Sequence, residues 1–281
     1  MLAEKQGTLT DEQRGFYAEN GFLFVPGLLT KAEAGELRQQ AHALISGLSG
    51  RPGLESTWGS ARGIAGQRET QLLHCHNVEY HSALFTKLIV DDRLTAGAAE
   101  LIGGPNVQLH HTKLFIKPPE KGSPFPLHQD YPFFPHERHS MIAAVIHFDD
   151  APIEKGCLRV VPGSHRLGPL EHDPGGSWHL PFEQYPLDSS VPCPAKAGDV
   201  LFFSYLTIHG SDVNISQEAR TTLLVQLRDP ADRQIEGGRD AGQGLMLRGS
   251  LPSEHEGQGT RSITPARAAP GRRRRRRRAG S

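Results

Sequence analysis

The stretch DVLFFSYLTIHGSDVNISQEARTTLLVQLRD, residues 199 to 229, contains two β-rich runs separated by a polar turn. The first run is dense in aromatic and branched side chains, and the second begins at Arg220 and is rich in Thr, Leu and Val. Such side chains favour a pleated, half-buried surface. The stretch therefore predicts two buried strands, with a polar connection between His209 and Arg220.

Three earlier runs have the same character and the same kind of boundary. Pro, Gly and Asp turns separate them, which is the spacing of an antiparallel sandwich or barrel. The runs are VQLHHTKLFIKP (107–118), MIAAVIHFDD (141–150) and CLRVVPGSH (157–165). From about Val107 onward we therefore expect a double-sheet β core.

The residues before this core have helical signals. Two capping boxes, Thr10 to Gln13 and Thr30 to Glu33, predict the starts of two helices. Residues 48–70 are rich in Gly, Arg and Ser without periodicity, and predict a long loop. Residues 80–102 predict two further helical pieces, with Asp91 as an N-cap and Gly103-Gly104-Pro105 as a stop. We expect a mainly β, α+β protein with flanking helices, in one domain over residues 1–236.

The charge distribution separates the remaining residues, 237–281, from this domain. They contain 11 of the 31 Lys and Arg side chains but only 3 of the 31 Asp and Glu side chains, and they end in the run Arg272 to Arg278. Their Gly, Pro, Ser and Arg content predicts a disordered tail. That tail is either a solvated appendage or a binder of RNA or acidic surfaces. The domain itself is acidic, so no nucleic-acid partner is expected for it.

Other classes of protein are not favoured by the composition. No run of 18 apolar residues and no secretory signal pattern occur, so we expect a cytoplasmic protein without a membrane partner. Cys75, Cys157 and Cys193 are far apart and form no C-x-x-C pair. Neither a disulfide framework nor a thiolate zinc site is therefore predicted.

The segment PFPLHQDYPFF, residues 124 to 134, places His128 and Asp130 one residue apart. Side chains at i and i+2 of a strand share a face, so both could converge on one point while Gln129 turns away. His209 adds a second imidazole at the end of the aromatic strand. Two imidazoles and one carboxylate are the ligands of non-haem Fe(II) sites with open positions. The alternative for H-x-D alone is a polar kink in a packed strand.

Arg220 suggests what such a metal would bind. A metal-bound 2-oxo acid such as 2-oxoglutarate has a far carboxylate, which a guanidinium group can hold through two hydrogen bonds. Ser211 can share the strand face of His209 and donate its hydroxyl to the same carboxylate. In the alternative, Arg220 is a surface partner of Asp212 or Glu218.

Taken in order, these motifs resemble the phytanoyl-CoA dioxygenase family of Fe(II)/2-oxoglutarate oxygenases. The resemblance rests on HQD, MIAAVIHFDDAPIEKGCLRVVPGSHR, AGDVLFF and HGSDVNISQEAR, and covers roughly residues 12 to 232. It implies a double-stranded β-helix, that is, a jelly-roll or cupin-like core. It also implies hydroxylation of an unactivated C–H bond in a small molecule, with Fe(II), 2-oxoglutarate and O2, and with conversion of 2-oxoglutarate to succinate and CO2.

The resemblance also implies a role for each site residue. The iron ligands and catalytic residues would be His128, Asp130 and His209. Arg220 would clamp the far carboxylate of 2-oxoglutarate, with Ser211 beside it. In HHTKLFIKPP the resemblance implies that Lys113 contacts the cosubstrate and offsets its charge, whereas the alternative for Lys113 is a lysine at a strand edge.

Substrate and oligomeric state stay open at this point. The family includes hydroxylases of ectoine, of antibiotic and terpenoid intermediates and of other small molecules, and the peroxisomal S-K-L ending is absent from the given sequence, which ends in AGS. The competing function is a cupin-like, metal-dependent isomerase or hydrolase, or a catalytically silent binding protein on the same fold. Arg220 discriminates between them, because neither has a use for a guanidinium that binds a far carboxylate.

Three other features have less specific interpretations. His74-Cys75-His76 lacks a third ligand nearby, and His165 in PGSH is expected to be a structural donor. His110 and His111 should point to opposite faces of their strand, so that at most one faces inward. The aromatic residues after the H-x-D motif either line a substrate pocket or belong to the core; they are Tyr131, Phe133 and Phe134.

Overall fold

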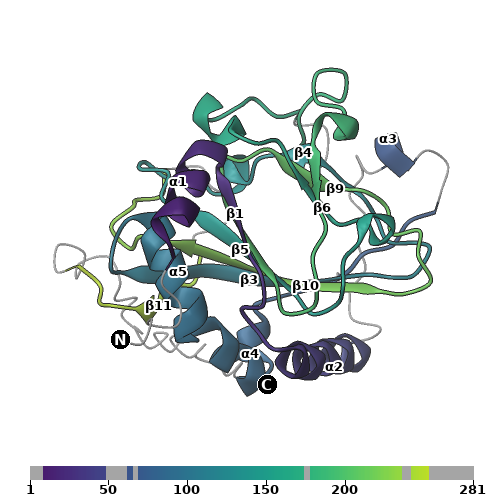
Figure 1. Ribbon diagram of the computed structural model, residues 1–281, viewed down its shortest axis with the longest axis horizontal. Coiled ribbons are helices and arrows are strands. Elements are labelled where there is room, and N and C mark those ends of the chain that lie inside the picture. Colours follow the sequence, from purple (N-terminus) through teal and green to yellow (C-terminus); the bar gives the residue numbers. More distant parts are fainter. Residues whose placement is uncertain (1–8, 49–61, 66–68, 174–177, 236–241, 253–281) are drawn as a thin grey trace, which may run out of the picture.

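The computed structural model describes residues 9–48, 62–65, 69–173, 178–235 and 242–252 (Figure 1). Five α-helices and eleven strands occur in these ranges. The helices are α1 (Asp11–Asn20), α2 (Lys31–Gly47), α3 (Arg62–Ala65), α4 (Ala83–Ile89) and α5 (Asp92–Ile102). The strands are β1 (Phe22–Val25), β2 (Leu73–His76), β3 (Val107–Lys117), β4 (Phe125–His128), β5 (Ile142–His147), β6 (Leu158–Val160), β7 (Val191–Cys193), β8 (Val200–Ser204), β9 (His209–Ser211), β10 (Arg220–Arg228) and β11 (Leu245–Arg248).

The strands form two antiparallel sheets that face each other. The larger sheet has the order β1-β8-β5-β10-β3-β11, with β2 also paired to β3, and the smaller has the order β4-β9-β6-β7. Neighbours in space are mostly distant in sequence, as in β10 between β3 and β5. The predicted double-sheet β core with flanking helices is confirmed.

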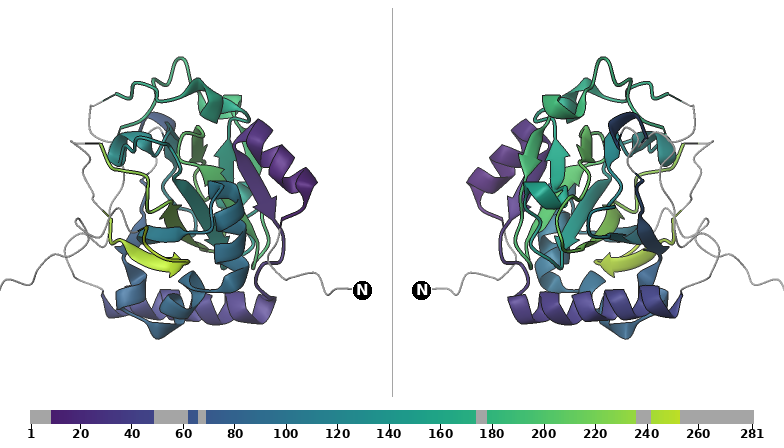
Figure 2. Two further views of the ribbon diagram at one scale, coloured as in Figure 1. Left: turned by 90° about the vertical axis from the view of Figure 1, so that its left-hand side faces the viewer. Right: turned by 90° about the vertical axis from the view of Figure 1, so that its right-hand side faces the viewer.

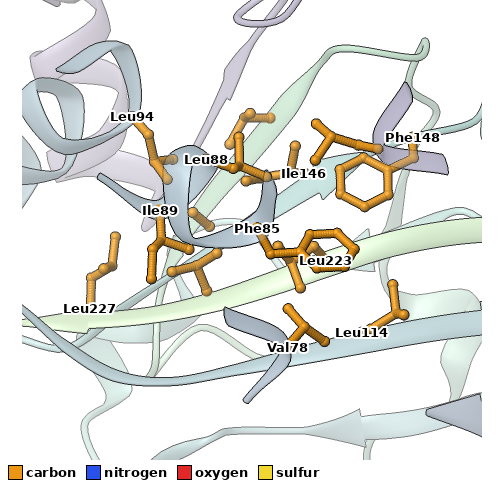
Figure 3. Packing of buried hydrophobic residues seen from close by; sticks show 14 of the residues in the cluster. Val78, Phe85, Leu88, Ile89, Leu94, Leu114, Ile146, Phe148, Leu223 and Leu227 are labelled. Carbon is orange, nitrogen blue, oxygen red and sulfur yellow. The ribbon is translucent and has the colours of Figure 1, made fainter. Parts of the chain in front are cut away.

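Helices α2, α4 and α5 cover the outer face of the larger sheet, opposite the smaller sheet (Figures 1 and 2). Leu223, Val225 and Leu227 of β10 are fully buried on this helical side. Phe85 of α4 packs against the same layer, with its ring centroid 6.4 Å from that of Phe148 (Figure 3). This apolar layer leaves the alternate side chains of β10 to face the space between the sheets.

Local sequence signals account for the helix starts. Thr10 with Gln13 and Thr30 with Glu33 form the predicted capping boxes, in which each side chain bonds the backbone of the other residue. Asp91 caps α5 by accepting a hydrogen bond from the Arg93 backbone. The expected loop at residues 48–70 lies largely outside the described residues, although residues 62–65 of it form the short helix α3.

Strands β3 and β10 contain an irregularity that changes one expectation. Gln226 pairs with His111 but Leu227 pairs with Leu109, so His110 is the extra residue of a bulge. His110 and His111 are both buried, and their Nδ1 atoms lie 2.7 Å apart. The expectation that at most one of the two faces inward is therefore wrong, because the bulge resets the alternation of side chains.

The expectation of disorder from residue 237 onward is wrong for part of that segment. Strand β11 pairs with β3 through Leu245 opposite Leu109 and Met246 opposite Gln108. The Arg248 guanidinium also lies 2.9 Å from the carboxylate of Asp92. The sequence lacks a strong strand signal here, but the free edge of β3 offers backbone donors and acceptors. Residues 253–281, with the arginine run, lie outside the described residues.

Across the described ranges, we find no helix with the length and apolar content needed to cross a membrane.

Candidate metal centre and cosubstrate pocket

A cavity of about 200 Å³ lies between the two sheets and contains the predicted site. Its walls come from β3, β5, β8 and β10 of the larger sheet and from β4, β6 and β9 of the smaller one. All six predicted site residues line it: Lys113, His128, Asp130, His209, Ser211 and Arg220. The fold thus brings residues from three parts of the chain into one cavity.

His128 and His209 meet because β4 pairs with β9. The two residues are directly opposite each other in the ladder, and their ring centroids lie 4.2 Å apart. Asp130 Oδ1 lies 3.8 Å from His128 Nε2 and 3.7 Å from His209 Nε2. One potential ligand atom from each residue is therefore within 4.8 Å of the other two, which is the spacing of a metal-binding triad.

Asp130 reaches this point by a turn and not by strand alternation. Strand β4 ends at His128, and Asp130 has helical dihedral angles of φ −74° and ψ −21° at the start of a 3₁₀ turn. Its backbone N–H donates to the carbonyl of Tyr205 at 3.0 Å. Gln129 does turn away, since its amide donates to the carbonyls of Gly168 and Leu206.

The hydrogen bonds of both imidazoles suit metal binding. His128 Nδ1 lies 2.7 Å from the Pro126 carbonyl, and His209 Nδ1 lies 3.0 Å from the Thr207 carbonyl. A ring nitrogen beside a carbonyl carries the proton, so in the neutral ring Nε2 has the lone pair. Burial lowers the pKa of His128 to about 3 and that of His209 to about 4, so both rings are neutral at pH 7.

Gln226 of β10 orients the carboxylate and was not identified from the sequence. Its side-chain amide donates to Asp130 Oδ2 at 2.8 Å, and both groups are buried. The other oxygen, Oδ1, is thereby directed toward the two imidazoles. Burial raises the pKa of Asp130, while the hydrogen bond from Gln226 acts in the opposite direction. Periodicity could have suggested Gln226, because it shares a strand face with Arg220 at even spacing.

The other end of the cavity is basic. Arg220 is 3% exposed and donates through Nη1 to the carbonyl of Gly156, while its Nε has no partner among the described residues. Lys117 is fully buried, and its Nζ donates to Ser211 Oγ at 2.7 Å. Burial lowers the pKa of Arg220 to about 10, and burial next to Arg220 lowers that of Lys117. Lys117 is a second residue that was not identified from the sequence.

Lys113 lines the cavity between these two ends. It lies on the same face of β3 as Phe115, and its Nζ is 5.0 Å from the centroid of that ring. Burial lowers the pKa of Lys113 to about 8, and the charge of Asp130 opposes that shift. Lys113 pairs with Leu224 of β10 on one side and with His76 of β2 on the other, so it does not lie at a strand edge.

The structure also places the histidines and aromatic residues that had less specific interpretations. His128, Asp130 and His209 are the one group with metal-ligand spacing in the described part of the chain, and His74 and His76 are not part of it. His165 Nε2 bonds the Ala18 carbonyl, as expected for a structural residue. Phe133 and Phe134 line the cavity, whereas the Tyr131 ring lies 5.6 Å from that of Tyr205, outside the lining.

The family model of phytanoyl-CoA dioxygenase (PhyH) matches residues 17–222, well over half of the chain. This chain belongs to the phytanoyl-CoA dioxygenase family. It is 30% identical over 232 residues to peroxisomal phytanoyl-CoA dioxygenase from Rattus norvegicus, which covers 76% of this chain and 67% of that protein. It is 30% identical to methylphosphonate hydroxylase from Gimesia maris (78% and 80% covered). It is 27% identical to ectoine dioxygenase from Halomonas elongata (83% and 74% covered).

Solved structures with the same fold are also similar to this chain. A non-haem α-ketoglutarate-dependent carbocyclase, SnoK from nogalamycin biosynthesis, superposes with a TM-score of 0.68 at 25% identity, covering 86% of this chain and 95% of that one. The epimerase SnoN in complex with Fe3+, α-ketoglutarate and a nogalamycin compound has a TM-score of 0.67 at 22% identity, covering 85% and 98%. The predicted jelly-roll, cupin-like fold is confirmed.

Membership of the phytanoyl-CoA dioxygenase family confirms the predicted enzyme class. The protein is a non-haem Fe(II)- and 2-oxoglutarate-dependent oxygenase, and iron and 2-oxoglutarate are the cofactor and cosubstrate of that class. The donor set in the cavity fits both groups. Two neutral imidazoles with Nε2 lone pairs face a carboxylate at one end. At the other end lies a buried guanidinium whose Nε has no partner in the part of the chain that the structure describes.

Proposed function

We propose that this protein hydroxylates an unactivated C–H bond of a small molecule and converts 2-oxoglutarate to succinate and CO2. One oxygen atom of O2 ends in succinate and the other in the new hydroxyl group. The proposal depends on one observation: the triad and the basic end line the same cavity between the two sheets. The relatives named for methylphosphonate and ectoine support a small substrate.

Under this proposal, His128, Asp130 and His209 are the iron ligands, and bound Fe(II) supplies the activation of O2. The backbone carbonyls beside each Nδ1 keep the two imidazoles in the correct tautomer. Gln226 prevents Asp130 from rotating its carboxylate away from the imidazoles. These contacts pre-organise the ligand atoms, so little reorganisation accompanies metal binding.

Arg220 and Ser211 hold the far carboxylate of 2-oxoglutarate at the basic end of the cavity, in the same proposal. A buried guanidinium binds a carboxylate strongly because water does not compete for it. Lys113 lies between this end and Asp130 and offsets the charge of the bound cosubstrate. Phe133 and Phe134 form an apolar wall that keeps water from the reacting C–H bond.

The basic end also bears on the competing functions. An isomerase, a hydrolase or a silent binding protein gains nothing from a buried guanidinium beside a metal site, and burial of unpaired charge is costly. A dicarboxylic cosubstrate would compensate that charge. We further propose that the oxygenase domain begins in the N-terminal helices and extends beyond residue 236 to include β11.

The test is calorimetric titration of 2-oxoglutarate into the protein with Fe(II) under anaerobic conditions, followed by measurement of succinate release in air with ascorbate and a panel of small molecules. We expect binding that requires the metal. Arg220→Ala should weaken it by roughly 2–5 kcal/mol, as expected when one partner of a buried charged pair is lost. Lys196→Ala, a change at an exposed lysine bonded to Asp150, serves as the control. Metal-independent binding, or no binding, would contradict the proposed function.

A further inference from the structure

A row of aromatic and imidazole rings borders one part of the cavity. The centroids of neighbouring rings in this row lie 6.2, 5.5, 6.3 and 5.1 Å apart, which is the range of ring–ring contacts. The first four rings line the cavity, and the last contacts the row from outside the lining. In order, the ring row consists of His76, His111, Phe134, Phe133 and Trp178.

The ring row lies beside Asp130. Phe133 ends the 3₁₀ turn that Asp130 begins, and its backbone N–H donates to the Asp130 carbonyl at 3.1 Å. His111 is directly opposite Gln226 in the ladder between β3 and β10, and the Gln226 amide binds the Asp130 carboxylate. Arg220 is the first residue of the same strand β10. The row therefore borders the metal end of the cavity and not the basic end.

The ring row also extends to the surface. In the described part of the chain, His76 is the only exposed residue of the cavity lining. Phe133 is half-buried, whereas His111 and Phe134 are buried. A molecule that enters beside His76 therefore meets these rings before it reaches the triad.

Rings in this arrangement favour a flat ligand over a saturated one. Offset and edge-to-face contacts between aromatic rings are more favourable than burial of the same apolar area alone. Burial lowers the pKa of His111 well below its usual value, so this imidazole is neutral at pH 7 and can stack as an aromatic ring. A saturated ring of the same size gains only from burial. The ring row should therefore discriminate between the two kinds of ligand.

Aromatic rings also attract cations, but Lys113 disfavours a cationic ligand here. Lys113 lines the same cavity and pairs with His76 in the ladder between β2 and β3. Burial lowers its pKa to about 8, so most of the amine is still protonated at pH 7. A second positive charge close to this ammonium group would be repelled. An uncharged ring gains the contacts with the row and avoids that repulsion.

We propose that the ring row binds the substrate, and that the substrate is a small molecule containing a planar, uncharged aromatic ring. This inference rests on the proposed function and adds the substrate class to it. The substrate ring lies against Phe133 and the two imidazoles, at the side of the cavity next to Asp130. The cosubstrate keeps the space between the triad and Arg220.

A purely structural role for these rings makes different predictions. Phe134 belongs to a buried cluster with Met141, Tyr205 and Leu206, and Phe133 packs against that cluster. If the rings served only this cluster, the cavity would have no preference between flat and saturated ligands. Loss of one ring would then weaken both kinds of ligand equally.

The experiment uses three probes with the same carbon skeleton. They are naphthalene-2-carboxamide, its saturated decahydro counterpart, and naphthalene-2-carboxamidine, which is a cation at pH 7. Each is titrated calorimetrically into the protein with Fe(II) and 2-oxoglutarate under anaerobic conditions. The aromatic amide should bind at least about 10-fold more tightly than either of the other two, because it contacts more than one ring of the row.

Phe133→Leu removes one ring of the row but keeps an apolar side chain. The Kd of the aromatic amide should rise about three- to 10-fold, and that of the decahydro amide should change by less than about twofold. His76→Leu, at an exposed position, should act in the same direction. Phe16→Leu is the matched control, because this ring is 43% exposed on α1 and lies outside the cavity lining. It should change neither Kd.

Several results would overturn the inference. Equal Kd values for the aromatic and decahydro amides would do so, as would an equal loss for both amides in Phe133→Leu. If Phe133→Leu does not fold, the same comparison in His76→Leu decides. Binding of the amidine as tight as that of the amide would contradict an uncharged substrate ring. Failure of all three probes to bind, while 2-oxoglutarate still binds in a metal-dependent manner, would overturn this inference and leave the proposed function intact.

Discussion

Gln226 shows how an uncharged side chain can prepare a charged site. Its amide binds one oxygen of Asp130, and the geometry of a carboxylate then directs the other oxygen to the imidazoles. An ionised carboxylate accepts hydrogen bonds but donates none, so an amide N–H is a suitable partner. The orientation of Asp130 is thus decided from the opposite sheet.

Gln226→Leu should lower the affinity for Fe(II) by about 10- to 100-fold, the usual effect of removing a hydrogen bond to a metal ligand. The substitution keeps a side chain of similar size but releases Asp130 Oδ2. Iron affinity is measured by competition with a metal chelator under anaerobic conditions. Gln217→Leu is the control, because Gln217 is exposed and bonds Glu120. Equal affinities in the two variants would show that Asp130 does not depend on Gln226.

His209→Ala and His128→Ala should each abolish most iron binding while the protein stays folded. Two remaining ligands compete poorly with water for a divalent ion of moderate affinity. Bound iron is determined by elemental analysis after gel filtration, and folding is followed by circular dichroism. His81→Ala, a change at an exposed histidine, should retain the full iron content. Wild-type iron in either triad variant would mean that the metal lies elsewhere.

Strand β11 supplies hydrogen-bond partners for the backbone of β3 at the edge of the larger sheet. It covers the end of β3 at Val107, Gln108 and Leu109, and Gln243, just before it, donates to Asn77 at 2.8 Å. Without β11 the backbone groups of β3 would lose their partners at this edge. A single edge strand can therefore matter for stability although its residues are half-exposed or exposed.

Two truncations separate β11 from the residues after it. Ending the chain at residue 241 should lower the free energy of unfolding by about 2–4 kcal/mol, through lost ladder bonds and apolar contacts. Ending it at residue 252 should change that energy by less than about 0.5 kcal/mol, because the composition beyond predicts no packed core. Urea unfolding of both proteins provides the measurement. Equal midpoints would show that β11 contributes nothing.

Buried histidines give the whole molecule a common response to acid. Burial lowers the pKa of His147 to about 4, and the pKa values of His74, His128 and His209 are similarly low. In the unfolded chain these groups titrate near 6.5. Between pH 6.5 and about 4 the unfolded state therefore binds more protons than the folded state.

The contribution of these histidines to the free energy of unfolding of the metal-free protein should therefore be complete above pH 6.5. It should decrease as the pH drops through 6 and 5. Each group contributes at most about 1.4 kcal/mol per pH unit in this window. His147→Leu removes one such group, and the urea midpoint of this variant should fall less between pH 7 and pH 5 than that of the wild type. An identical pH slope would show that His147 accepts a proton freely in the folded protein.

Sequence patterns alone were enough to predict the helix starts, the strand-rich core and the candidate site residues His128, Asp130, His209 and Arg220. These features depend on local signals, such as capping boxes and β-branched runs, or on side chains whose chemistry is recognisable in order along the chain. Three features became visible only in the folded chain: Asp130 enters by a turn, His110 and His111 share a face, and Leu245–Arg248 completes a sheet. The fold also brings Gln226 into the cavity and Lys117 into contact with Ser211. The reason is that strand register, bulges and edge pairing depend on contacts between distant segments, and no local pattern encodes which partner a strand will meet.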